Sequence, residues 1–98
     1  MKGIKIIVAD ITTLEVDAIV NAANRSLLAS CYDTAMKLAE ENHLKSIAFS
    51  CISTGVYGFP KAEAARIATR VLNEHLQNGY DGEIIVCCFT ESDAQYYQ

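Results

Sequence analysis

Residues 46–60 read SIAFSCISTGVYGFP, and this stretch decides the fold. Its first half, residues 46–52, is mostly apolar and is bounded by a loop, which predicts a buried strand. Its second half carries Gly55 and Gly58 and ends at Pro60, a residue that suits the first position of a helix because its missing N–H costs nothing there. The stretch therefore predicts a strand, a glycine-rich loop and a helix in that order.

The segment after this stretch continues the alternation of helix and strand. Apolar residues recur there at helical spacing, and the set is Ala64, Ile67, Ala68, Val71, Leu72 and Leu76. The pair Asn78-Gly79 predicts a left-handed end to this helix. Residues 83–89 are apolar nearly throughout, which predicts a central strand, and residues 92–97 a last helical turn or two.

The segment before it predicts two strands, at residues 4–9 and 17–23, and then a helix. Ser30 with Asp33 fits a capping box that opens this helix, which runs to about residue 42. The order strand, strand, helix, strand, helix, strand, helix predicts an α/β fold with mostly parallel pairing. We expect one domain over residues 1–98.

Composition narrows the function classes. With 51% hydrophobic residues and one proline in 98, the chain is typical of a globular protein, and its net charge of −4 argues against a general nucleic-acid binder. We expect a soluble, cytoplasmic protein without a membrane segment or signal peptide. The four cysteines form no C-x-x-C pair and show no ligand spacing to His43 or His75, both expected on helix surfaces, so neither a metal nor another cofactor is predicted.

The glycine-rich loop is the first candidate site. Ligands of open α/β sheets bind beyond the carboxyl ends of the strands, where this loop lies. Successive N–H groups of residues 53–57 predict an anion-binding nest. A glycine-rich turn without a ligand stays an open alternative. The loop is not a Walker motif, since no Lys-Ser/Thr follows, and the acidic balance disfavours the G-x-x-G loop of a KH domain.

Four segments carry a resemblance to a known family. They are ADIT (9–12), VDAIVNAAN (16–24), the opening stretch (46–60) and VCCF (86–89). Together they resemble the macrodomains, a family of ADP-ribose-binding modules, although Ala9 stands where that family usually has glycine. The resemblance implies a three-layer α/β sandwich with about four mostly parallel strands in the order 1-4-3-2 and about three helices.

The resemblance also implies roles for individual residues. Asp10 would accept a hydrogen bond from the adenine amino group, with Ile11 beside it, and Phe89 would stack on adenine. Asn24 would reach the distal ribose and is the candidate catalytic residue. The diphosphate would be wrapped by Ser53, Thr54, Gly55, Val56 and Tyr57. From the residues alone, Asp10 is also compatible with a turn or cap, and Phe89 with a place in the core. For Asn21 we expect a structural hydrogen bond and not a contact with the ligand.

One departure from the family is large. After Asn24, macrodomains continue into a glycine-rich loop, a helical region and two further strands, whereas here residues 24–30 run directly into the next helix. We therefore expect a shortened macrodomain whose second strand is an unpaired edge, open to pairing in a homodimer. Binding of ADP-ribose or a related adenine diphosphate is the leading function. Deacetylation of O-acetyl-ADP-ribose or removal of ADP-ribose from proteins is the enzyme alternative, and a scaffold without ligand is the third.

Overall fold

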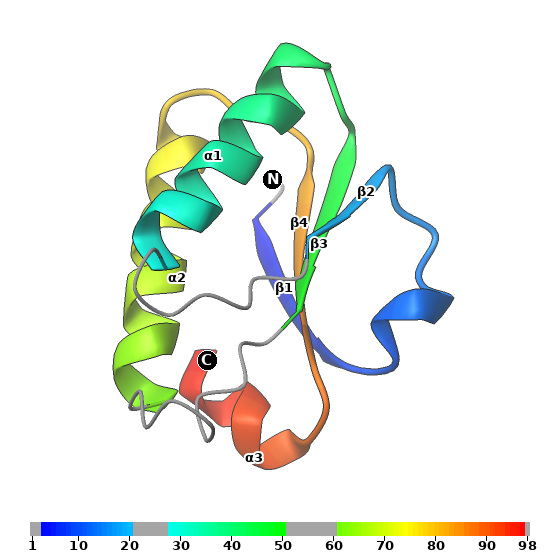
Figure 1. The fold of residues 1–98 in the computed structure, drawn as a ribbon, viewed down its shortest axis with the longest axis vertical. Coiled ribbons are helices and arrows are strands. Elements are labelled where there is room, and N and C mark those ends of the chain that lie inside the picture. Colours follow the sequence, from blue (N-terminus) through cyan, green and yellow to red (C-terminus); the bar gives the residue numbers. More distant parts are fainter. Residues whose placement is uncertain (1–2, 21–27, 51–60, 98) are drawn as a thin grey trace.

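The structure is a computed structural model that describes residues 3–20, 28–50 and 61–97, of which residues 28–30 and 61 only as backbone. Within these residues the strands are β1 (Ile4–Val8), β2 (Ala18–Val20), β3 (Ser46–Ser50) and β4 (Glu83–Cys88). They form one sheet in the order β1-β4-β3-β2, and every neighbouring pair is parallel. The predicted α/β class and strand order are confirmed (Figure 1).

The helices follow the predicted alternation. They are α1 (Leu28–Glu41), α2 (Lys61–Gln77) and the short α3 (Glu91–Ala94), with 3₁₀ turns η1 (Ile11–Thr13) and η3 (Gln95–Tyr97). Gly79 has a φ of 111°, so the predicted left-handed end of α2 is confirmed. Among the described elements, helix α1 lies between β2 and β3 in the chain.

The hydrophobic core lies between α1, α2 and one face of the sheet. Alternate strand residues point to this face and pack against both helices, among them Ile47 and Phe49 of β3 and Ile84, Val86 and Cys88 of β4. The Phe49 ring meets the ring of Tyr32 from α1 with centroids 4.9 Å apart. Figure 1 shows α1 and α2 side by side on this side of the sheet.

The opposite face of the sheet is formed by the residues in between, and Ala48, Ile85 and Cys87 are buried there. Figure 1 shows the segment that carries η1 on this side, and η1 contacts β3. In the part of the chain that the structure describes, the third layer is thus a short 3₁₀ segment, and all three α-helices lie toward the other face.

A histidine joins the two long helices. The ring of His75 on α2 lies between two carboxylates of α1, with Nδ1 2.7 Å from Glu40 Oε1 and Nε2 2.8 Å from Asp33 Oδ1. Both contacts are hydrogen bonds at once only when the ring carries two N–H groups. The hydrogen bond from His75, with a smaller contribution from Lys37, lowers the pKa of Asp33.

Three sequence predictions are corrected here. The capping box is wrong, because α1 begins at Leu28, two residues before Ser30, and Asp33 binds His75 and Lys37 instead. His75 does not lie on a helix surface but is only 9% exposed, since its partners on α1 cover it. His43 is exposed as expected, but it lies in the turn after α1, with a φ of 54°.

Candidate functional site

The candidate site lies at the edge of the sheet where all four strands end. Because the strands are parallel, the segments that follow Val8, Val20, Ser50 and Cys88 leave the sheet at this one edge. Strands β1 and β4 end together, since Val8 pairs with Cys88 and the Ala9 N–H donates to the Cys88 carbonyl at 3.1 Å. Asp10 and Phe89 therefore follow neighbouring strand ends, although they are far apart in the sequence.

Phe89 projects from this edge into solvent. It is 76% exposed, the largest value among the exposed large hydrophobic residues that the structure describes, so the alternative that places it in the core is wrong. The run of buried residues in β4 ends at Cys88, and at Thr90 the chain turns to cap α3, with Oγ1 accepting from the Asp93 N–H at 3.1 Å. An exposed aromatic ring at a strand end is a ready platform for a planar ligand.

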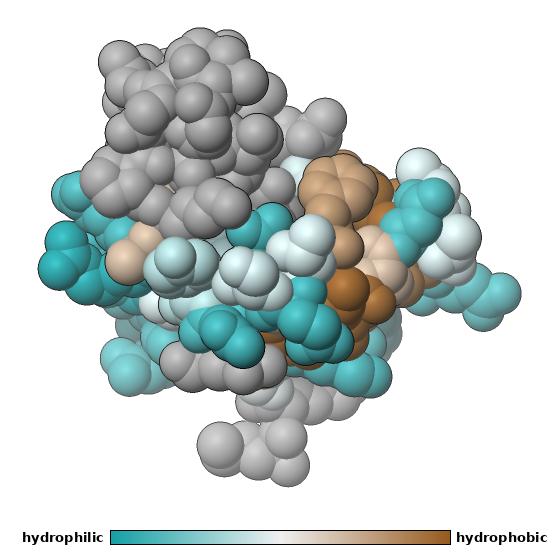
Figure 2. All heavy atoms as spheres, turned by 90° about the horizontal axis from the view of Figure 1, so that it is seen from below, coloured by the Kyte–Doolittle hydropathy of each residue, from teal (hydrophilic) through white to brown (hydrophobic). Residues whose placement is uncertain are grey.

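Figure 2 looks onto this edge from below. It shows hydrophobic side chains gathered in one patch among polar ones. Val8 at the end of β1 is 40% exposed and contributes apolar surface next to the Phe89 strand end. Such a patch beside polar groups suits a ligand with a flat apolar face and a polar rim.

Asp10 caps the turn η1, in agreement with the cap alternative, and its predicted contact with adenine stays a prediction. Its Oδ1 accepts from the Thr12 N–H at 2.9 Å and from the Thr12 hydroxyl at 2.7 Å. These bonds, the side-chain one first, lower the pKa of the Asp10 carboxyl. In the described part of the chain no hydrogen bond reaches Oδ2, and the residue is exposed. The cap therefore leaves one oxygen able to accept from a ligand.

Two further residues support this corner of the site. Ile11 follows Asp10 and is half-buried in η1. The thiol of Cys87 donates to the Ala9 carbonyl at 3.0 Å, which fixes the chain just before Asp10. Sequence reasoning missed both this thiol and Thr12. A signal for the backbone contact was present, because an aspartate side chain often accepts from the backbone N–H two residues later in an Asx turn.

The remaining predicted site residues lie outside the described residues. Asn21 and Asn24 fall in residues 21–27, and Ser53, Thr54, Gly55, Val56 and Tyr57 fall in residues 51–60. Their attachment points are described. Residues 21–27 continue from β2, and residues 51–60 connect β3 to α2. Both segments thus start from the strand-end edge that carries Asp10 and Phe89.

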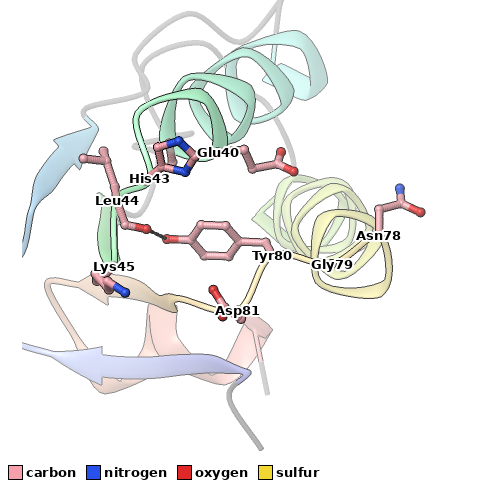
Figure 3. Close-up of a pocket in the computed structure, with 9 residues that line it drawn as sticks. Glu40, His43, Leu44, Lys45, Asn78, Gly79, Tyr80 and Asp81 are labelled. Carbon is pink, nitrogen blue, oxygen red and sulfur yellow. Dashed lines mark hydrogen bonds between the residues drawn. The ribbon is translucent and has the colours of Figure 1, made fainter.

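A hollow of about 290 Å³ lies at the other end of the sheet (Figure 3). It lies between the turn after α1 and the turn after α2, and Glu40, Lys45 and Asp81 give it charges of both signs. The Tyr80 hydroxyl donates to the Leu44 carbonyl at 3.0 Å, and burial raises the Tyr80 pKa. None of the predicted site residues lines this hollow.

Among the residues that the structure describes, no group of three or more His, Cys, Asp or Glu side chains is placed to hold a metal ion. Over the same residues, no helix combines the length and apolar character that crossing a membrane requires.

Comparison with known proteins gives consistent matches. A model of the Macro domain family matches residues 5–68. ADP-ribose glycohydrolase MACROD2 of Mus musculus is 43% identical over 81% of this chain, which spans only 17% of that protein. The Oceanobacillus iheyensis macrodomain with ADP is 45% identical, with a TM-score of 0.69 over 74% of this chain and 38% of that one. The Trypanosoma brucei macrodomain in complex with ADP has a TM-score of 0.85 over 96% of this chain and 66% of that one, and at 24% identity it supports the fold alone.

Proposed function

Because the chain belongs to the Macro domain family, we propose that it binds ADP-ribose or a related adenine diphosphate at the strand-end edge of its sheet. The observation that carries this proposal is that the exposed ring of Phe89 and the Asp10 carboxylate follow the ends of two neighbouring strands. A ring can stack on the face of adenine, and a carboxylate oxygen can accept from the amino group on its edge. The Oceanobacillus iheyensis structure, which contains ADP, supports this ligand class.

The diphosphate is assigned to the glycine-rich loop. Backbone N–H groups of Ser53, Thr54, Gly55, Val56 and Tyr57 would gather its oxygens, helped by the N-terminus of α2, which begins at Lys61. This arrangement needs no lysine cluster and so fits a chain with a net charge of −4. Asn24 would reach the distal ribose from the segment that follows β2.

The shortened connection between β2 and β3 predicts a particular ligand profile. The chain has no glycine-rich loop between Asn24 and α1, so we propose that one wall of the distal-ribose pocket is missing. Affinity should then depend on adenine and the two phosphates and little on the distal ribose. Titration calorimetry with ADP-ribose, ADP and AMP tests this. Similar affinities for ADP-ribose and ADP are expected, and a strong preference for ADP-ribose would contradict it.

Thermal melting tests the alternative that the chain is a scaffold without a ligand. ADP should raise the melting temperature of the unmodified chain, and Asp10→Ala should reduce that rise. If neither protein responds to ADP or ADP-ribose, the fold acts as a scaffold and the proposed function is wrong.

Hydrolysis of ADP-ribose linkages is the second candidate, favoured by the 43% identity to an ADP-ribose glycohydrolase. Such a reaction needs a water molecule held near the scissile bond by converging groups. Asn24 and Tyr57 are the candidates in this chain, and Asn24 is the one that we assign to catalysis. Incubation with mono-ADP-ribosylated protein and with O-acetyl-ADP-ribose separates the two functions, because turnover that is lost in Asn24→Ala would identify an enzyme.

We also propose that β2 pairs with a second copy of the chain. It is an edge strand of the sheet, and Ile19 on it is 48% exposed. Edge strands without charged or proline guards tend to recruit another strand. Light scattering over a concentration series should show a dimer that Ile19→Lys disfavours. A strictly monomeric protein at high concentration would rule this out.

A further inference from the structure

The carboxylate of Asp10 is held by a single residue. Thr12 directs both its backbone N–H (2.9 Å) and its hydroxyl (2.7 Å) to the same oxygen, Oδ1. Two donors on one oxygen restrict rotation of the carboxylate about its Cβ–Cγ bond. The other oxygen, Oδ2, is then held on the side away from Thr12, and it accepts no hydrogen bond from the described residues.

The hydrogen bonds also favour the ionised form of this carboxylate. Donors bound to a carboxylate favour its ionised form, and they lower the pKa of Asp10 here. An ionised carboxylate accepts hydrogen bonds and donates none. A group that can only accept discriminates sharply between a base edge with an amino group and one with a carbonyl oxygen, since the latter would face it acceptor to acceptor.

We propose that Thr12 is a positioning residue that holds Asp10 as a fixed acceptor and thereby makes the site select bases with an exocyclic amino group over bases with a carbonyl at that position. This inference rests on the proposed binding of an adenine diphosphate. The selecting contact is made by Asp10, and Thr12 acts through it.

The neighbouring threonine provides a matched control. Thr13 also donates its hydroxyl to Asp10 at 2.7 Å, but to the main-chain carbonyl and not to the carboxylate. Thr12 and Thr13 are both exposed and lie in the same 3₁₀ turn. Replacing each by valine removes one hydroxyl from the same turn, and only the change at Thr12 alters the support of the carboxylate.

The test compares ADP with inosine diphosphate, which carries a carbonyl in place of the adenine amino group. Calorimetry on the unmodified chain should show ADP binding about tenfold or more tightly than inosine diphosphate. In Thr12→Val the affinity for ADP should fall about threefold to tenfold, while the affinity for inosine diphosphate changes less. The ratio of the two affinities should therefore decrease. Thr12→Ser, which keeps the hydroxyl, and Thr13→Val should both show the affinity ratio of the unmodified chain.

A pH series adds an independent measurement. Loss of the hydroxyl raises the pKa of the Asp10 carboxyl toward its ordinary value, so the affinity of Thr12→Val for ADP should begin to fall at a higher pH than that of the unmodified chain. Protonation of adenine affects the binding of ADP to every variant equally, so it does not contribute to the difference between their pH profiles. Should Thr12→Val fold poorly, Thr12→Ala replaces it in both measurements.

The outcomes separate the two proposals. If the unmodified chain binds neither nucleotide, the proposed function fails and this inference with it. If the chain binds ADP, but the hydroxyl-free variants at Thr12 keep both the base preference and the pH profile, the function stands and the positioning role of Thr12 is wrong. An equal loss of preference in Thr13→Val would also overturn it, because a general weakening of the turn would then explain the effect.

Discussion

Truncating two phenylalanines that the structure places in opposite environments separates binding from stability. Phe89 is 76% exposed at the end of β4, whereas Phe49 is fully buried in the core against Tyr32. Phe89→Ala and Phe49→Ala remove the same atoms. We expect the first to weaken ligand binding with little change in stability, and the second to destabilise the fold.

The magnitudes follow from these exposures. Truncating a buried phenylalanine costs about 3–5 kcal/mol, which is a large part of the roughly 5–15 kcal/mol that stabilises a domain of this size. Phe89 has roughly a quarter of its surface in contact with the protein, so its truncation should cost about 1 kcal/mol or less. Stacking on a base contributes about 1–3 kcal/mol, so Phe89→Ala should weaken ADP binding about 5- to 150-fold.

Thermal melting with and without ADP measures both effects in one experiment. At a ligand concentration of about 100 times Kd, binding stabilises the unmodified chain by about 2.7 kcal/mol. If Phe89→Ala raises Kd about tenfold, the same concentration contributes about 1.4 kcal/mol. A difference of about 1.3 kcal/mol corresponds to a melting-point rise that is about 5–10 °C smaller. Phe89→Trp, which keeps a stacking surface, should retain the full rise.

Two results would refute this reasoning. A large fall in melting temperature for ligand-free Phe89→Ala would mean that the ring packs inside the protein. An unchanged response to ADP in Phe89→Ala would mean that the base does not stack on this ring, whatever the fate of Phe49→Ala.

Two further predictions concern the fold. His75→Leu removes the largest cause of the lowered Asp33 pKa. A carboxyl whose pKa is lowered by folding stabilises the folded chain fully above its ordinary pKa of about 3.9, and this stabilisation is lost as the pH falls through the folded-state pKa. In urea unfolding between pH 2 and 6, the free energy of unfolding of His75→Leu should therefore fall less with decreasing pH than that of the unmodified chain. Gly79→Ala should lower the free energy of unfolding in urea by about 1–2 kcal/mol, because Gly79 has a φ of 111°. Gly3→Ala should have little effect, because Gly3 has open space around it and no positive φ. Equal losses of stability in the two variants would contradict the claim that alanine is strained at position 79.

The order of elements was predictable because its signals are local. The helical spacing of apolar residues after Pro60, the left-handed turn at Gly79 and the apolar run of residues 83–89 are all read within one element. Parallel pairing follows from the alternation of strands and helices. The hydrogen bonds of Asp10 to Thr12 join residues two positions apart, so the cap was also among the alternatives that the sequence offered.

The tertiary structure decided which side chains are buried and which are free. The sequence presents Phe89 as the last residue of an apolar run, and its exposure depends on where β1 stops beside β4, at the pairing of Val8 with Cys88. His75 follows helical spacing on α2, but its partners Asp33 and Glu40 lie 42 and 35 residues earlier on another helix. Local patterns determine which element forms, whereas burial and pairing depend on distant segments that meet only in the folded chain.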